Sequence, residues 1–207
     1  MNIPSPEASK TPDTDEAERR RVADWVARAR TGDEEAFGEL VRTYHERVFG
    51  VIYRMIHHAE DARELAQQAW VKAWQRLDSY KQESQFFTWI YRIAVNTAMD
   101  HVRRQARRRE VSLEDASPGA EPQPAVDWNP PGEGRPDEEL AQAEVRRAFQ
   151  DALGGLSPEH KAALILREVD GLSYREIADV LKCRIGTVMS RIYYARRMMQ
   201  EKMRDVR

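Results

Sequence analysis

Apolar residues recur every three or four positions along most of the chain, a spacing that places them on one face of an α-helix. In the first half, this pattern is interrupted at Thr31-Gly32-Asp33 and by a polar loop at 78–85. No segment shows the alternation typical of a half-buried strand. The pattern therefore predicts helices over about 18–30, 34–57, 61–77 and 86–109.

A different composition separates these helices from the rest of the chain. Residues 110–136 carry no apolar period and are rich in proline, including the pair Pro130-Pro131, so we expect an extended linker. Helical spacing resumes at Asp137. The expected fold is all-α, with two small helical domains joined by the linker. The expected boundaries are a disordered tail at 1–17, a first domain at 18–109, the linker at 110–136 and a second domain at 137–207.

The clearest local signals lie near the C-terminus. Ser173 and Glu176 form a capping box at the start of a short helix, because each side chain can pair with a free backbone N–H. The turn KCRIG then separates this helix from a longer one. Such a pair is typical of a helix-turn-helix, which lays its second helix in the major groove of DNA. The side chains expected to pack the two helices together are Ile177, Ala178, Leu181, Ile185, Val188 and Ile192.

Charge is distributed unevenly along the chain, although the net charge is only −2. Residues 110–139 contain nine acidic residues and one basic residue, whereas 173–207 contain nine basic and four acidic residues. The segment RRQARRR at 103–109 adds five arginines. Basic segments on both sides of an acidic strip indicate nucleic-acid contact by both domains. With 41% hydrophobic and 33% charged residues, we expect small separate cores rather than one thick core.

Several function classes lack the residues that they need. Cys183 is the only cysteine, which excludes an intramolecular disulfide and a CxxC metal site, and the five histidines form no ligand pattern. No phosphate-binding loop, dinucleotide fingerprint or nucleophile elbow occurs. We therefore expect no metal, no cofactor, no small-molecule substrate and no enzyme activity. The chain has neither an apolar run of the roughly 20 residues that a membrane span needs nor a signal-peptide core, so we expect a cytoplasmic protein without membrane insertion.

Four segments, in order, resemble the extracytoplasmic-function (ECF) sigma factors of bacterial RNA polymerase. They are DEEAFGELVRTYHERVFGVIYRMI, EDARELAQQAWVKAWQRLDSY, FFTWIYRIAVNTAMDHVRRQARR and LSPEHKAALILREVDGLSYREIADVLKCRIGTVMSRIYYAR. The resemblance covers most of 33–200. It implies that the first domain (sigma region 2) binds core polymerase and opens the -10 promoter element, while the second (region 4) reads the -35 element. It also implies an anti-sigma factor as a regulator, although the chain carries no signature of one.

The resemblance assigns two surfaces to the first domain. A polar helix face would dock on the clamp coiled coil of the largest polymerase subunit through Asp61, Glu64, Gln67 and Gln68. The loop at 78–86 would hold a flipped -10 base, and Asn96 would contact the non-template strand. Aromatic and basic side chains suit such contacts with unstacked bases and phosphates. The full set expected at the -10 element is Ser79, Tyr80, Lys81, Trp89, Arg92, Asn96, Arg103 and Arg104.

In the second domain the resemblance assigns the -35 element to Arg175, Arg184, Thr187, Ser190, Arg191, Tyr193, Tyr194 and Arg197. The chain departs from the family at Lys182, which replaces a turn glycine and would need a positive φ, and at Arg184, which replaces a proline. Met189 and Tyr194 stand where basic residues are common. These departures leave the fold in place and the promoter sequence open. The acidic linker would lie in the nucleic-acid channel of polymerase.

Each assignment has a simpler alternative. The helix-turn-helix could belong to a stand-alone regulator of duplex DNA, or the chain could be a helical adaptor for acidic proteins. Phe87 could be a core residue, Asn96 could cap or bridge helices, the polar face could be ordinary solvated surface, and the linker could be a simple tether. Transcription from a defined site, upon mixing with core polymerase, would separate a sigma factor from these alternatives.

Overall fold

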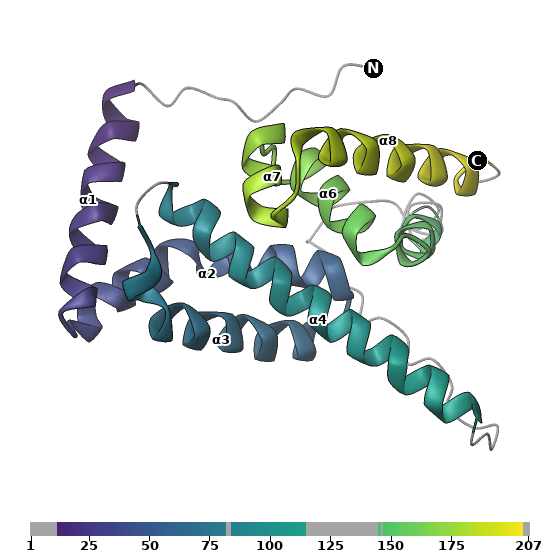
Figure 1. The fold of residues 1–207 in the computed structure, drawn as a ribbon, viewed down its shortest axis with the longest axis horizontal. Helices are drawn as coiled ribbons and strands as arrows, with labels where there is room; N and C mark the ends of the chain where they lie inside the picture. Colours follow the sequence, from purple (N-terminus) through teal and green to yellow (C-terminus); the bar gives the residue numbers. More distant parts are fainter. Residues whose placement is uncertain (1–11, 82–83, 115–144, 146, 205–207) are drawn as a thin grey trace, which may run out of the picture.

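All regular structure in the described part of the chain is helical, as the sequence predicts (Figure 1). The computed structural model describes residues 12–81, 84–114, 145 and 147–204. The N-terminal helices are α1 (Pro12–Arg30), α2 (Glu34–Ile56), α3 (Ala59–Gln75), the short 3-10 helix η1 (Leu77–Ser79) and α4 (Phe86–Glu114). The C-terminal helices are a helix that includes 147–154, α6 (Pro158–Glu168), α7 (Tyr174–Leu181) and α8 (Ile185–Lys202).

Capping side chains fix where several of the helices begin. Asp33 accepts a backbone N–H in the first turn of α2, and Ser157 does the same for α6, where Pro158 follows it. At the start of α7, both halves of the predicted capping box are present between Ser173 and Glu176. These side chains satisfy backbone donors that the first turn of a helix leaves free.

Two helices are longer than the sequence pattern predicts. α1 begins at Pro12 rather than near Glu18, because proline fits the first turn of a helix, where its missing N–H is not needed. α4 continues to Glu114 instead of ending at Arg109, because no proline or glycine interrupts 110–114. The rest of the expected tail and most of the expected linker lie outside the described residues.

One apolar core runs through both groups of helices, where the sequence predicts separate cores. It joins Val48 and Ile52 of α2 to Leu166 of α6 and Ile177 of α7. A smaller cluster lies within the C-terminal helices alone and includes Leu153. The two groups of helices are therefore packed against each other, with a continuous apolar interior.

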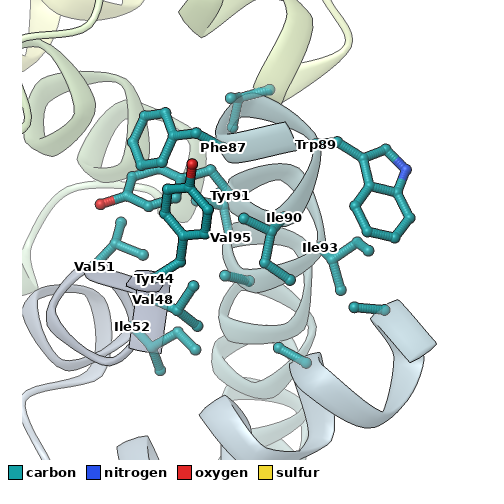
Figure 2. Packing of buried hydrophobic residues seen from close by; sticks show 14 of the residues in the cluster. Tyr44, Val48, Val51, Ile52, Phe87, Trp89, Ile90, Tyr91, Ile93 and Val95 are labelled. Carbon is teal, nitrogen blue, oxygen red and sulfur yellow. The ribbon is translucent and has the colours of Figure 1, made fainter. Parts of the chain in front are cut away.

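α4 is the helix around which this core is built. Phe87 and Ile90 are buried, as predicted for its inner face. Tyr91 and Val95 are also 0% exposed, because α4 packs against α2 and α3 and, in addition, against α6 and α7. Figure 2 shows Phe87 and Tyr91 on the side of α4 that faces α2, whereas Trp89 points away from them. α4 thus packs aromatic side chains on two of its sides, Phe87 and Tyr91 towards α2 and Trp89 away from them.

Candidate nucleic-acid interface

α8 buries one face and exposes the other. Val188, Ile192 and Met199 are buried, and Tyr193 and Tyr194 are 62% and 54% exposed. The two tyrosine rings meet edge to face, with 5.5 Å between their centroids. Of the residues expected at the -35 element, those exposed are Arg175, Arg184, Ser190, Tyr193, Tyr194 and Arg197, and those half-buried are Thr187 and Arg191. Polar, aromatic and cationic groups on one exposed helix face can contact base edges and phosphates in a major groove.

The turn before α8 has the backbone conformation that the sequence predicts. Lys182 caps α7 with φ of 49°, in the left-handed region, and its N–H bonds the carbonyl of Ala178. Cys183 is half-buried against the core, and its sulfur lies 3.7 Å from Nη1 of Arg191. The prediction for Ile185 is wrong: this side chain is 46% exposed, since it stands at the first position of α8, before the helix meets α7.

The arginines near the end of α8 are held differently. Arg196 pairs with Glu168 of α6, with 2.5 Å between Nη2 and Oε1, so it joins two C-terminal helices. Arg197 lies on the outer face, and its Nε is 3.1 Å from Glu201 one turn later. That hydrogen bond raises the pKa of Arg197 above its ordinary value. Exposed ion pairs of this kind contribute little stability, so Arg197 can leave Glu201 for another anion at small cost.

The residues expected at the -10 element divide into a buried and an exposed group. Tyr80 and Trp89 are only 6% and 4% exposed. Their rings pack together with Phe86, with centroids 5.3 to 5.7 Å apart. The exposed members are Ser79, Lys81, Asn96, Arg103 and Arg104, and Arg92 is half-buried. The aromatic side chains thus support this surface from inside, while polar and cationic groups form its accessible part.

A cleft of about 280 Å³ lies over the Asn96 face of α4. Its lining includes Trp89, Arg92 and Asn96 of α4 and Lys72 of α3, whose Nζ donates to the hydroxyl of Thr97 at 3.1 Å. Lys182 of the α7–α8 turn also lines this cleft. The helix-turn-helix therefore covers part of the surface on which the sequence places the -10 contacts.

An ion pair joins the basic end of α4 to the C-terminal helices. Nη2 of Arg103 lies 2.5 Å from Oε1 of Glu159 at the start of α6. The hydrogen bond from Arg103 lowers the pKa of that carboxyl. Arg104 instead donates to the backbone carbonyl of Asp100 at 3.2 Å. Of Arg103 and Arg104, both expected to bind DNA, Arg103 is thus paired with an acid of the other group of helices.

A second ion pair between the two groups is buried. Asp170, whose side chain is 8% exposed, lies 2.5 Å from Nη2 of Arg54, and the Tyr91 hydroxyl donates to the same carboxyl oxygen at 3.4 Å. Burial raises the pKa of Asp170 more than Arg54 lowers it, and burial likewise raises the pKa of Tyr91. Nε of Arg54 and Oδ2 of Asp170 find no hydrogen-bond partner among the described residues. The two side chains therefore pair through one oxygen and one nitrogen, while a second polar atom of each lacks a hydrogen bond.

A half-buried histidine and a buried lysine lie in the same region. His57 ends α2 in the left-handed conformation, with φ of 54°. Burial, together with the charge of Lys161, lowers the pKa of His57 to about 4. Lys161 of α6 is 8% exposed, and burial lowers its pKa to about 8. In both groups burial makes the charged form less favourable than it is in water, so the stability of this region depends on pH.

The polar face of α3 is accessible over most of its length. Glu64 and Gln67 are exposed, and Nε2 of Gln68 donates to Oε1 of Glu64 at 3.0 Å. Asp61 is half-buried, with Oδ2 at 3.5 Å from His58 and from His101 of α4. Three of the four residues expected at the polymerase thus form one surface, and Asp61 also links α3 to α4.

Neither a metal-ligand cluster nor a membrane-spanning helix occurs among the described residues. No three histidine, cysteine, aspartate or glutamate side chains there are arranged to hold a metal ion. None of the helices in this part combines the length and the apolar character required to cross a bilayer.

Sequence patterns give no contact between the two groups of helices. Glu159 belongs to the helix start signal at 157–159, and Arg54, Lys161 and Asp170 belong to no local motif, so none of the four is predicted to reach the other group. One signal in the sequence could have indicated a buried charge: Lys161 stands at the start of the apolar run KAALIL, and α6 buries it with that run.

Family comparisons match both groups of helices. Sigma-70 region 2 matches residues 40–108, and Sigma-70, region 4 matches residues 146–199. The RNA polymerase sigma-H factor of Pseudomonas aeruginosa is 37% identical over 83% of this chain and 88% of its own length. The ECF RNA polymerase sigma-E factor of Haemophilus influenzae is 36% identical over 87% of this chain and 94% of its own length.

Solved structures support the same relationship. The sigma factor RpoE from Bartonella quintana, in complex with the anti-sigma factor NepR, is 26% identical, with a TM-score of 0.61 over 83% of this chain and 98% of its own. CnrH, in complex with the cytosolic domain of CnrY, is 22% identical, with a TM-score of 0.62 over 89% of this chain and 97% of its own, and it supports the fold.

Proposed function

Because the chain belongs to the extracytoplasmic-function sigma factors, which direct core RNA polymerase to promoters at transcription initiation, we propose that its two groups of helices divide promoter recognition between them. The N-terminal helices would act at the -10 element and the C-terminal helices at the -35 element. Nucleotide addition belongs to the polymerase, so we assign no reaction to this chain. We place its work in the cytoplasm, where promoter DNA and core polymerase meet.

The observation that carries this proposal is the exposed face of α8. Ser190, Tyr193, Tyr194 and Arg197 stand together there, opposite the buried Val188 and Ile192. Serine and tyrosine hydroxyls suit hydrogen bonds to base edges, and an exposed arginine suits a phosphate. In this arrangement Arg175, Arg184, Thr187 and Arg191 complete the -35 contact from the start of α7 and the start and middle of α8.

For the -10 element we propose a surface made by the end of η1 and one side of α4. Asn96 and Arg92 would contact the non-template strand after opening, while Ser79 and Lys81 would approach a base that has left the stack. Trp89, which is buried and lines the same cleft as Lys182, would reach a base only after the Lys182 turn moves away, and Tyr80 would support this surface from inside. Arg103 and Arg104 would bind phosphates.

The remaining surfaces would bind protein. We propose that Asp61, Glu64, Gln67 and Gln68 dock on the clamp coiled coil of the largest polymerase subunit, and that the acidic linker lies in the nucleic-acid channel. We also propose an anti-sigma factor as a partner, because a sigma factor of similar fold was solved with one. A stand-alone regulator of duplex DNA would leave the region 2 helices without a task.

The packed arrangement bears on when these surfaces act. Lys182 lines the cleft over Asn96, and Glu159 holds Arg103. We propose that this arrangement belongs to the chain away from polymerase, and that the two groups of helices separate in the holoenzyme. The free chain should then bind promoter DNA weakly, and tight sequence-specific binding by the free chain would instead favour a stand-alone regulator.

Reconstitution with core polymerase tests the function directly. The holoenzyme should start transcription at defined sites on templates selected from a random library, and core polymerase alone should not. A chain with Ser190→Ala and Tyr194→Ala serves as the matched control, because it should bind polymerase yet lose site selection. Equal initiation with and without the chain would contradict the proposal.

A further inference from the structure

The last residue of α1 reaches the backbone of the loop assigned to the -10 base. Nε of Arg30 donates to the carbonyl of Leu77 at 3.3 Å, and Nη2 donates to the carbonyls of Asp78, at 3.5 Å, and of Tyr80. In this stretch the chain leaves the 3-10 helix and becomes extended at Tyr80. The carbonyl of Leu77 already accepts the N–H of Tyr80, so Arg30 gives it a second donor. One guanidinium therefore serves three carbonyls where the backbone changes direction.

A second anchor holds the same stretch from the other side. The Tyr80 ring is buried against Phe86 and Trp89, and its hydroxyl donates to the carbonyl of Ser84 at 2.7 Å. With Tyr80 directed inward, Ser79 and Lys81 on either side are exposed. Arg30 and the Tyr80 ring together fix which side chains this loop presents to solvent.

The chemistry of Arg30 is hard to replace. A guanidinium is planar and has five N–H donors in a fixed fork, whereas an ammonium group is a compact charge on a flexible stem. Lysine at this position would keep the charge but would not hold three carbonyls in one geometry. Arg28, on the same helix, has a different task, because its guanidinium pairs with Asp33 at 2.8 Å and with Asp24 at 3.8 Å.

We propose that Arg30 is a positioning residue for base selection at the -10 element, acting by fixing the backbone that presents Ser79 and Lys81. The proposal rests on the function proposed above for this loop. It also extends the DNA-reading unit to a helix outside the region 2 match, which begins at residue 40. α1 is then part of the promoter-reading surface through one side chain.

Promoter preference in the reconstituted holoenzyme tests this role. A promoter selected by the wild-type holoenzyme is altered one base at a time in the -10 and -35 elements, and transcript yields give a preference profile for each. The variants are Arg30→Lys, Arg30→Ala and the control Arg28→Lys. Helicity, thermal unfolding and affinity for core polymerase are measured on the same preparations.

We expect Arg30→Lys to lower the ratio between the best and worst base at the position read by the loop by about fivefold or more, the loss of one base contact. The -35 profile, helicity and polymerase affinity should match the wild type, and Arg28→Lys should leave both profiles unchanged. Arg30→Ala should have the same effect as Arg30→Lys or a larger one.

Two results would overturn the proposal. One is an unchanged -10 profile in Arg30→Lys, with yields reduced equally on every template. The other is loss of helicity or of polymerase binding in Arg30→Lys, which would make Arg30 a purely structural residue. If the wild-type holoenzyme shows no preference at any -10 base, the proposed function itself fails. If it shows one that Arg30→Lys retains, only this inference fails.

Discussion

Arg103 of α4 and Glu159 of α6 lie 2.5 Å apart, from Nη2 to Oε1, and so connect the two groups of helices. The arginine belongs to the basic segment proposed to bind DNA, and the glutamate belongs to the half of the chain that carries the helix-turn-helix. The same contact that holds the halves together therefore neutralises a cation of the -10 surface.

Replacing Glu159 should free Arg103 from the C-terminal helices and leave it only the weaker pairing with Asp100, 3.6 Å away on α4. We expect Glu159→Gln to raise the affinity of the free chain for a single-stranded -10 oligonucleotide about two- to fivefold, the magnitude of a partly exposed ion pair. Fluorescence anisotropy with a labelled oligonucleotide measures this. Glu168→Gln is the control, because it removes the same charge from a pair with Arg196 that lies within the C-terminal helices. An equal gain in affinity in both variants would mean that the change in net charge, and not the release of Arg103, causes the effect.

The buried bases predict how stability depends on pH. His57 has a pKa of about 4 in the folded chain against an ordinary 6.5, so the unfolded state binds more protons in that interval, and the free energy of unfolding should fall as pH falls through it. Lys161 has a pKa of about 8 against 10.5, so stability should rise between those two values. The raised pKa of Asp170 opposes the His57 effect in acid. Urea denaturation across this range measures both slopes.

Variants separate the two contributions. Lys161→Met should abolish the alkaline rise and stabilise the chain at neutral pH by about 1–3 kcal/mol, because it removes a buried charge. His57→Asn should reduce the acid slope, and asparagine tolerates the left-handed backbone found there. Persistence of the alkaline rise in Lys161→Met would mean that another group is responsible.

The outer face of α8 should separate base selection from phosphate binding. We expect Ser190→Ala or Tyr194→Ala to change the preference at individual -35 bases, each contact being worth roughly 1–3 kcal/mol. Arg197→Ala should weaken binding to all sequences and flatten its dependence on salt. Holoenzyme binding to -35 variants over a salt series tests both. Glu201→Gln is the control, since it frees Arg197 and should not weaken binding.

Asn96 should matter for opening and not for -35 binding. It is exposed on α4, whereas the helix-turn-helix lies in the C-terminal helices. In the Asn96→Ala holoenzyme we expect normal protection of the -35 element and reduced permanganate reactivity of unpaired thymines at the -10 element. Normal opening, or lost -35 protection, would contradict the division of tasks between the two groups of helices.

The polar face of α3 should bind polymerase. Replacing Glu64 and Gln67 together with alanine should reduce co-purification with core polymerase without changing helicity, because both side chains are exposed and neither supports the core. The matched control replaces Glu60 and Arg63, an exposed pair on the same helix with 3.0 Å between Oε1 and Nη1. Undiminished binding in the first variant would make this face ordinary solvated surface.

Local signals are sufficient for much of the fold. The capping box of Ser173 and Glu176 and the positive φ of Lys182 depend on neighbours within a few residues, and the structure confirms both. The site residues themselves remain predictions, because their partners are DNA and another protein. What the structure adds is their accessibility: Ser79 and Asn96 are exposed, whereas Trp89 is buried.

Contacts between the two groups of helices could not be predicted from sequence patterns. Arg54 and Asp170 are 116 positions apart, and no periodic pattern relates positions so distant. A helix that is covered on two sides also loses the amphipathic pattern by which its inner face is recognised, as the full burial of both Tyr91 and Ile90 on α4 shows. The contact between Arg30 and the backbone of residues 77–80 could not be predicted either, because it joins distant parts of the chain and belongs to no short motif.

The continuous core influences how tightly core polymerase binds this chain, because it sets the fraction of molecules whose two groups of helices have separated. If polymerase binds only molecules whose two groups of helices have come apart, the measured dissociation constant equals the intrinsic constant divided by the fraction already apart. A fraction of about one per cent would weaken apparent affinity about a hundredfold. Leu166 and Ile177, fully buried in that core, contact neither DNA nor polymerase in the proposed complex, yet their packing would set how strongly this chain competes for core enzyme.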